Sequence, residues 1–595
     1  MTGTPGRARG FARRVTAICV IMSLAALACL GRLAFIQLLE GRSIAEAATA
    51  SRTLSVPISA SRGRILDRNG TVLASSVERY TVVANPDAIA DFTPVTCTSK
   101  TKSYCHEVDG KPVGATGAAA VARLLAPVLG MNALELGATM SVSGQYVILK
   151  KNVTPTVMRR IEALNLGGYV YGELSSDRVY TSGTLAGALL GGVNDEGTGV
   201  AGIELMENSN LTGTDGYKVY QRGNGGEEIP GTVTKSKDAV NGSDVTLTID
   251  SDVDWYVKKV LTEGVKQYDA DWAIACVQDV STGQILALED SDDVTAGSDE
   301  AKMSVSRAVG TTFEPGSIGK VFSISGMLQT GAHSLTDRFT VPWKIEKDGQ
   351  TYRDSDEHAT SRWTLAGILA ESSNVGMVMA GDKYSNAERY EFLTKFGIGQ
   401  SSGLGLPGES LGTLGSASSW DGRTQNTVLF GQGYSTNILQ ITNAIATIAN
   451  KGVRLQQSII KSVTKAGGHT TTTSTGKATR VVDADVASQM MNAMESSAEH
   501  YKNYVSISGY RIAAKSGTAE VMGTNGKVDG IVADWAGILP ADNPRFVITV
   551  VMKNPEGDYG GITSGPLFKK IGEFLMQKYQ VASSSTRTGA IAVDW

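Results

Sequence analysis

A serine and a lysine stand three residues apart in the segment FEPGSIGKVF, residues 313–322. Pro315 is typical of the first turn of a helix, where no backbone N–H is needed. In such a helix Ser317 and Lys320 share one face. A lysine whose pKa is lowered by burial can take a proton from a serine hydroxyl and activate it as a nucleophile. The pair indicates acyl transfer, but alone it could equally be two ordinary residues at a helix start.

Two further motifs supply polar groups for such a reaction, and they read Ser372-Ser373-Asn374 and Lys515-Ser516-Gly517-Thr518. On a strand, Ser516 and Thr518 point the same way and could hold a carboxylate together with Lys515. Gly517 would let a substrate backbone approach closely. The ordinary alternatives are helix caps for the first motif and a solvated strand edge for the second.

The elements around these motifs predict an α+β protein. Residues 245–580 begin with strands, continue with helices and end with strands and a closing helix, which predicts one antiparallel sheet flanked by helices. Residues 40–240 show short strands and amphipathic helices of a separate α+β region. Residues 581–595 are small and polar, which predicts a flexible tail.

The start of the chain differs from the rest. An arginine-rich segment, residues 1–14, precedes an apolar run over 15–39 that can cross a bilayer as a helix if Arg32 reaches the interface. The basic flank predicts a cytoplasmic N-terminus and a catalytic domain outside the membrane. The alternatives are a cleaved signal peptide at residues 26–28 and a lipoprotein signal at Cys29.

Composition narrows the remaining possibilities. The chain has 595 residues, 42% of them hydrophobic, and a net charge of −4, so we expect two or three folded units and no nucleic-acid partner. Outside the cell, Cys97 and Cys105 would suit a disulfide, and two free thiols are the alternative. The cysteine spacing shows no metal site, and the predicted chemistry requires no metal or organic cofactor.

With its three motifs in this order, the chain resembles class B penicillin-binding proteins, the membrane-anchored peptidoglycan D,D-transpeptidases. The segment RGRILDRNGTVLA (62–74) resembles the N-terminal motif of that family, and GIELMENSNLTGTDG (202–216) resembles its second non-catalytic motif. The resemblance covers nearly all of residues 30–580. It implies a transmembrane helix, an elongated pedestal of the dimerisation type and a serine β-lactamase-like transpeptidase domain. One departure is Gly319, which predicts a looser start to the nucleophile's helix.

The resemblance implies a role for each catalytic residue. Ser317 would attack the penultimate carbonyl of a stem peptide ending in D-Ala-D-Ala, and Lys320 would take its proton. Ser372 would relay that proton to the leaving D-alanine, with Lys515 close to its hydroxyl. Asn374 would hold the peptide amide.

The same resemblance assigns substrate binding to the lysine strand. Ser516 and Thr518 would bind the terminal carboxylate, and Gly517 would give the substrate backbone room. The backbone N–H groups of Ser317 and Thr518 would form the oxyanion hole.

A further set of residues is interpreted as structural rather than catalytic. From residue type alone its charged members could be surface salt bridges, whereas the resemblance implies that they link the pedestal to the catalytic domain. The set is Arg62, Gly63, Asp67, Arg68, Gly70, Gly202 and Glu204.

The resemblance also implies partners and leaves alternatives open. The expected ligands are stem peptides and β-lactam antibiotics, and the expected protein partners are a multi-pass membrane glycosyltransferase and other division proteins. The division-specific branch is favoured over elongation or sporulation. A D,D-carboxypeptidase, a β-lactamase or β-lactam sensor, and a non-catalytic scaffold remain alternatives.

Overall fold

The computed structural model describes residues 6–221, 223, 228–473, 476–522 and 528–595, and these form two compact units. The first unit comprises Met1–Ala60, Glu78–Ser175 and Thr214–Val240. The second comprises Ser61–Val77, Ser176–Gly213 and Asn241–Trp595. Two segments from the 40–240 region are therefore counted with the unit that carries the three motifs.

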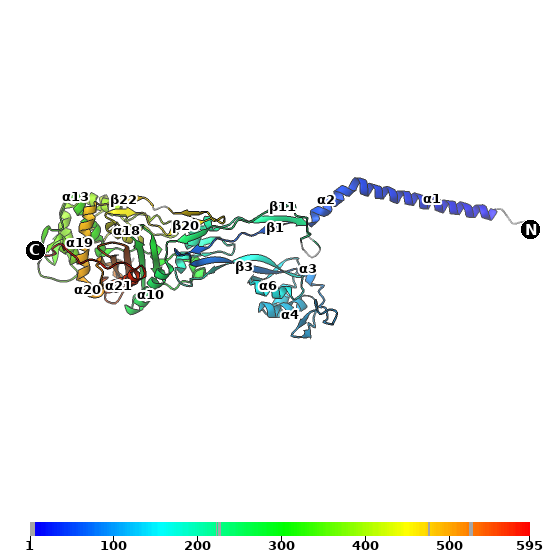
Figure 1. The fold of residues 1–595 in the computed structure, drawn as a ribbon, viewed down its shortest axis with the longest axis horizontal. Coiled ribbons are helices and arrows are strands. Elements are labelled where there is room, and N and C mark those ends of the chain that lie inside the picture. The colour runs from blue at the N-terminus through cyan, green and yellow to red at the C-terminus, as the bar shows by residue number, and fades with distance from the viewer. Residues whose placement is uncertain (1–5, 222, 224–227, 474–475, 523–527) are drawn as a thin grey trace, which may run out of the picture. The chain divides into compact units, whose positions relative to one another are not determined.

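The first unit begins with helices. These are α1 (Gly6–Ala34), the π-helical turn η1 (Phe35–Glu40) and α2 (Gly41–Arg52). Figure 1 shows α1 as one long continuous helix. The stretch Gly10–Gln37 is long and apolar enough to cross a membrane, in agreement with a single-pass anchor. Residues 1–5 of the expected cytoplasmic segment lie outside the described residues.

The rest of the first unit is a small α+β fold. Its elements include β1 (Thr53–Ile58), α3 (Pro86–Ile89), β4 (Glu107–Val108), β5 (Lys111–Pro112), α4 (Gly117–Leu129), α5 (Ala133–Thr139), β6 (Val147–Val153), α6 (Pro155–Glu162), β10 (Gly216–Gln221) and β11 (Lys235–Lys237). Val121, Leu125 and Ile161 lie in its apolar core. A disulfide joins Cys97 to Cys105.

Two long strands contribute residues to both units, β3 (Val72–Ala84) and β7 (Val170–Tyr180). Within the first unit β3 pairs antiparallel with β6, and β1 pairs with β10. Within the second unit β2 (Ile65–Leu66) pairs with the start of β3 and, in parallel, with β12 (Asp244–Leu247).

A five-stranded antiparallel sheet forms the centre of the second unit. Its strands, in spatial order, are β14 (Ile285–Asp290), β13 (Trp272–Asp279), β25 (Phe546–Lys553), β24 (Val528–Leu539) and β23 (Ala513–Met522). The strand β23, which carries Lys515, is an edge strand. The predicted antiparallel sheet flanked by helices is therefore confirmed.

Helices cover both faces of this sheet. On one face, α10 (Ser251–Gln267) packs against α21 (Ser564–Lys578), with Tyr256 and Phe574 stacked at 4.3 Å between ring centroids. Figure 1 shows these two helices together in green and red. On the other face lie α13 (Gly319–Thr330), α18 (Ile438–Ala449) and α19 (Ala484–His500). The three motifs meet on this second face.

Shorter elements complete the second unit. They include the helices α7 (Gly187–Leu190), α8 (Gly202–Met206), α9 (Asn208–Leu211), α11 (Asp299–Met303), α12 (Arg307–Gly310), α14 (Leu365–Ala370), α15 (Asn374–Ala380), α16 (Asn386–Phe396), α17 (Thr424–Thr427) and α20 (Lys502–Val505). The 3-10 turns are η2 (Gly316–Ile318), η3 (Gly381–Lys383), η4 (Ala417–Ser419) and η5 (Val428–Phe430). Small strand pairs are β8 (Gly192–Val193) with β9 (Gly199–Ala201), β15 (Arg338–Val341) with β18 (Ser361–Thr364), β16 (Lys344–Lys347) with β17 (Gln350–Arg353), and β19 (Val453–Leu455) with β22 (Ala478–Arg480). Two more strands, β20 (Ile460–Thr464) and β21 (Thr470–Thr472), pair with each other, and β20 also pairs with β12.

Residues 581–595 run along the second unit. Arg587 donates a hydrogen bond to Glu499 at 2.7 Å, and the backbone N–H of Thr364 donates to the carbonyl of Val593 at 2.9 Å. The indole of Trp595 packs against two arginine guanidinium groups, 5.3 and 5.2 Å from its ring centroid. The sequence predicts a flexible tail here, and its small polar composition does not reveal these contacts.

Candidate active site

Ser317 lies in the short turn η2, immediately before α13. The Nζ of Lys320, in the first turn of α13, donates to Ser317 Oγ at 2.6 Å. Gly316 packs so tightly on β23 that a Cβ there would lie 2.5 Å from the carbonyl oxygen of Thr518. This approach places the serine beside the backbone of the lysine strand.

Gly319 has a packing role that its helix propensity does not reveal. A Cβ at this position would lie 2.5 Å from the Cα of Gly431 and 2.7 Å from the hydroxyl of Tyr434. The sequence predicts a looser helix start, whereas in the structure the glycine allows two backbone segments to pack in direct contact behind Ser317. Its absent side chain therefore helps to fix the nucleophile segment.

Lys320 is fully buried and makes several hydrogen bonds beyond Ser317. Its Nζ donates to the carbonyl oxygen of Ser372 at 2.8 Å and to Oδ1 of Asn374 at 2.7 Å, and it lies 3.3 Å from Ser372 Oγ. Burial, together with the charge of Lys515, lowers the pKa of Lys320 well below its usual value. The amine is therefore suited to accept a proton from Ser317.

Ser372 sits in a strained turn between α14 and α15. Its φ of 61° is left-handed, an unfavourable conformation for a non-glycine residue. The helix cap is the next residue, Ser373, which accepts from the N–H of Gly376 at 2.8 Å. The side chains of Ser372 and Asn374 are thus free to face Lys320, and the capping alternative applies to neither of them.

Asp354 holds this turn in place. Its buried carboxylate accepts from the Ser373 hydroxyl at 2.6 Å and from the Val375 N–H at 2.9 Å, and His358 Nε2 lies 3.0 Å from it. The sequence did not indicate Asp354, because it stands in an irregular segment without a motif. Only the fold brings it to the turn.

Lys515 approaches Ser372 from β23. Its Nζ donates to Ser372 Oγ at 3.0 Å and to the carbonyl of Ser516 at 3.0 Å. Burial lowers the pKa of Lys515 to about 7, while the charge of Asp534 opposes that shift. The hydroxyl of Ser372 therefore lies between two buried amines, an arrangement that can pass a proton along a short path.

The three motifs line one cleft of about 210 Å³. The residues that the sequence singled out on its walls are Ser317, Ser372, Asn374, Ser516, Gly517 and Thr518. Lys320 and Lys515 lie buried behind them. Among the described residues, no group of histidine, cysteine, aspartate and glutamate is arranged to hold a metal ion.

The cleft also has a rim that the sequence motifs did not indicate. It includes Asp356, His358, Trp363, Glu371, His500 and Tyr559. Its members come from loops, helix ends and the strand β18, so no local pattern in the sequence identifies them. Aromatic and charged side chains of this rim therefore surround the hydroxyls and amines of the three motifs.

Glu371 and His500 form an ion pair on this rim, with 3.6 Å between Oε1 and Nδ1. Contact with the Glu371 carboxylate raises the pKa of His500, and the same contact lowers the pKa of Glu371. In a Glu371→Gln variant, His500 should therefore lose its proton at a lower pH than in the wild type. Histidine-selective NMR titration measures this, with Glu357→Gln as a matched exposed control. An unchanged His500 titration in Glu371→Gln would contradict the pairing.

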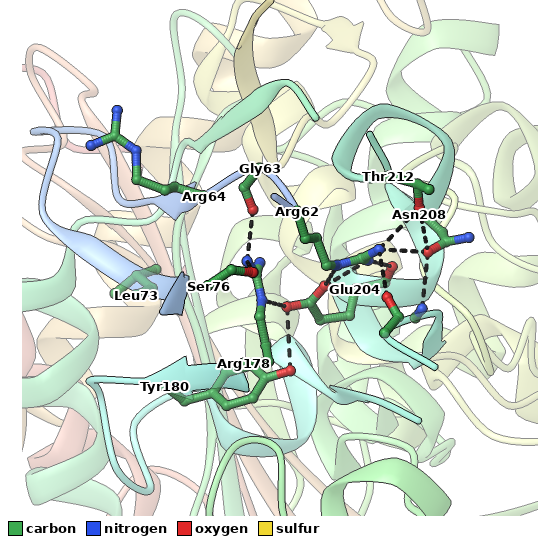
Figure 2. A network of polar contacts seen from close by, with 12 residues as sticks. Arg62, Gly63, Arg64, Leu73, Ser76, Arg178, Tyr180, Glu204, Asn208 and Thr212 are labelled. Atoms are coloured by element: carbon green, nitrogen blue, oxygen red, sulfur yellow. Dashed lines mark hydrogen bonds and ion pairs between the residues drawn. The ribbon is translucent and has the colours of Figure 1, made fainter. Parts of the chain in front are cut away.

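The structural motif residues form a buried network, shown in Figure 2. Glu204 is fully buried and accepts from Arg62 Nε and from Arg178 Nε, both at 2.7 Å. Arg178 also donates to the carbonyl of Gly63 at 2.7 Å, and Arg62 to Asn208 at 2.8 Å. These are not surface salt bridges, and Arg178 and Tyr180 are members that the sequence did not reveal.

Asp67 connects the N-terminal motif, residues 62–74, to the helix α10. Its carboxylate accepts from the hydroxyl of Ser251, at the start of α10, at 2.6 Å. The N–H of Arg68 donates to the carbonyl of Ile249 at 2.9 Å. Gly70 stands in the turn that follows, and Gly202 opens α8. All of these contacts lie within the second unit.

Comparison with known proteins identifies the family of the chain. Residues 273–573 match the family described as Penicillin binding protein transpeptidase domain, and residues 57–247 match Penicillin-binding Protein dimerisation domain. Penicillin-binding protein PbpB of Mycobacterium tuberculosis is 31% identical over 98% of this chain and 87% of its own length. Peptidoglycan D,D-transpeptidase FtsI of Escherichia coli K12 is 28% identical over 96% of this chain and 92% of its own. A solved peptidoglycan synthetase from Bifidobacterium adolescentis is 63% identical with a TM-score of 0.75, and the match covers 91% of this chain and 100% of that one.

Proposed function

Since the chain belongs to the class B branch of the penicillin-binding protein transpeptidases, we propose that it cross-links peptidoglycan stem peptides through an acyl-enzyme on Ser317. One observation carries this assignment. The hydroxyls of Ser317 and Ser372 lie 2.6 and 3.3 Å from the same buried amine, the Nζ of Lys320. Both serines line a cleft whose wall also includes Thr518.

Acylation begins with attack of Ser317 Oγ on the carbonyl carbon of the penultimate D-alanine. The hydroxyl proton passes to the neutral Nζ of Lys320. Negative charge develops on the carbonyl oxygen and is stabilised by the N–H groups of Ser317 and Thr518. The close packing of Gly316 on Thr518 supports this pairing of donors, because it brings the two backbones together.

Expulsion of the terminal D-alanine needs a proton on its nitrogen. Ser372 gives its hydroxyl proton to that nitrogen and regains one from the ammonium of Lys320. The C–N bond breaks, the ester to Ser317 remains, and Lys320 returns to its neutral form. An amine from a second stem peptide then attacks the ester, and the same groups carry its proton in the reverse direction.

Substrate binding is assigned to the residues around these groups. The hydroxyls of Ser516 and Thr518 take the terminal carboxylate of the donor peptide. The amide of Asn374 accepts from Lys320 through Oδ1, and its Nδ2, 3.5 Å from the carbonyl of Arg353, donates to the peptide. Gly517 has no side chain, so the peptide backbone can approach the strand closely at this position.

Covalent labelling by a fluorescent penicillin tests the nucleophile. A Ser317→Ala protein should lose all covalent label, because the β-lactam carbonyl has no other activated hydroxyl to acylate. The control is Ser355→Ala, a serine that lines the same cleft without a catalytic role, and it should label as the wild type does. Label that persisted on Ser317→Ala would overturn the assignment.

The fate of the acyl-enzyme separates the related activities. A transpeptidase should hold a penicilloyl group for minutes or longer and pass a peptide acyl group to an added amine. Rapid release to water would indicate a β-lactamase, and release of a peptide acyl group to water alone would indicate a D,D-carboxypeptidase. Both are measured by mass spectrometry of the intact protein.

The relatives named PbpB and FtsI favour a role in cell division. In this proposal α1 anchors the protein with its arginine-rich N-terminus in the cytoplasm and the cleft outside. A multi-pass membrane glycosyltransferase that supplies the glycan strand is the expected partner, together with other division proteins. A fluorescent fusion should concentrate at the septum, and labelling along the lateral wall would favour elongation.

A further inference from the structure

Asp534 is a buried carboxyl that the mechanism above does not use. It lies in the middle of β24 and is 1% exposed. Its neighbours on the same face of the sheet, Val532, Ala536 and the cross-strand Val551, belong to the apolar core. Within the described part of the chain, no other residue donates a hydrogen bond to either carboxylate oxygen. Such a position is unfavourable for a carboxyl group and calls for a compensating charge.

Asp534 packs directly against the lysine strand. Asp534 stands opposite Gly517 in the ladder between β23 and β24. A Cβ on Gly517 would overlap Oδ1 of Asp534, so the glycine leaves the space that this carboxyl fills. The glycine of the motif is therefore required by the carboxyl behind it, as well as by a substrate in front.

Lys515 is the cation on the same face. It pairs with Ala536, which makes it a diagonal neighbour of Asp534, and both residues project to the side of the sheet where α13 lies. The Nζ of Lys515 is fully buried and bonds Ser372 Oγ at 3.0 Å. The carboxyl of Asp534 thus lies on the same side of the sheet as the amine that bonds Ser372.

We infer that Asp534 is a positioning residue for the reaction at Ser317, because its carboxyl group keeps Lys515 in the ammonium form beneath Ser372. This inference rests on the proposed function. The ammonium stabilises negative charge on Ser372 Oγ while the hydroxyl proton moves to the departing nitrogen. Asp534 touches neither substrate nor Ser372 and acts through Lys515.

The electrostatics of the pair act in two opposite directions. Burial lowers the pKa of Lys515 and raises that of Asp534, and the charge of each residue opposes the shift of the other. Other ionisable groups that interact with this pair are Lys320 on α13, His500 at the end of α19, and Tyr434 in the segment before α18. Tyr434 also interacts with Glu314, which precedes η2. The helix α18 itself carries no ionisable group. Because the charge of Asp534 opposes the lowering of the Lys515 pKa, Lys515 keeps its proton to a higher pH than it would without this carboxylate.

The pH dependence of acylation by a fluorescent penicillin tests the inference on the full-length protein. In Asp534→Asn the carboxylate no longer stabilises the ammonium, so the fall in rate on the alkaline side should begin at a lower pH. At the alkaline end the rate should be about tenfold below that of the wild type, with the acidic side unchanged. A merely structural role would lower the rate at every pH and leave the profile in place.

A matched control and a second variant complete the experiment. Asp254→Asn replaces another buried carboxyl, on α10 at the opposite face of the sheet, and should not move the profile. Asp534→Ser is smaller, so it avoids any failure of the asparagine to pack, and it should give the same displacement. If the wild type is acylated but the alkaline fall in acylation rate begins at the wild-type pH in both Asp534 variants, the inference is overturned. A wild type that penicillin does not acylate would instead overturn the proposed function.

Discussion

Replacing Lys320 with methionine should lower the rate constant for acylation by a penicillin about 10²- to 10⁴-fold, the usual contribution of a general base. Methionine preserves the length and apolar stem of the side chain but removes the amine that lies 2.6 Å from Ser317 Oγ. Stopped-flow or gel-based measurement of penicillin labelling gives the rate constant. Lys383→Met, at an exposed lysine of the same domain, should leave it unchanged.

The pH dependence of the same reaction gives a second measure of this base. Because burial and Lys515 lower the pKa of Lys320, the amine is neutral above that lowered pKa and becomes an ammonium as pH falls through it. The acylation rate should therefore fall on the acidic side. Lys320→Arg should also be inactive, since a guanidinium remains protonated at every relevant pH. Acylation of Lys320→Met at the wild-type rate would show that another group takes the proton.

Replacing Glu204 with alanine should lower the free energy of unfolding of the second unit by about 3–5 kcal/mol, as expected when one partner of a buried ion pair is removed. The substitution leaves two guanidinium groups uncompensated, those of Arg62 and Arg178, whose side chains are 7% and 4% exposed. Thermal unfolding of the full chain in detergent, followed by loss of penicillin labelling, should show a clearly lower transition temperature.

The control for this variant is Glu196→Gln, an exposed glutamate on the loop before β9. A surface change of that kind should alter stability by no more than about 0.5 kcal/mol. Glu204→Gln keeps the shape and some hydrogen bonds, so its transition should lie between those of wild type and Glu204→Ala. A Glu204→Ala protein that unfolded at the wild-type temperature would refute the structural role of the network.

Local sequence patterns predicted the parts of the site that local geometry determines. Ser317 and Lys320 meet because one turn of backbone fixes their separation, and Ser516 and Thr518 share a side because strand residues alternate. The antiparallel sheet with its flanking helices follows from the same periodicities. The resemblance to a family added the roles of these residues.

The remaining members depend on contacts between residues far apart in the chain. Lys515 and Ser372 are 143 residues apart, and Arg178 and Gly63 are 115 apart. Asp354, His500 and Asp534 stand in segments whose local pattern is that of an ordinary loop, helix end or strand. Sequence periodicity does not identify which distant residue such a side chain contacts in the fold. The contacts of Asp354, His500 and Asp534 are therefore known only from the structure.

The tight packing around the serine has a consequence for antibiotic resistance. A side chain at Gly316 or Gly319 would collide with the backbone of Thr518 or of Gly431, so a β-lactam-resistant variant should not carry a substitution at either glycine. Resistant variants should instead accumulate at the exposed rim, at positions such as Asp356 and Tyr559, where a change can exclude a drug without displacing Ser317. The close backbone packing at Gly316 and Gly319 thus limits where resistance mutations can arise.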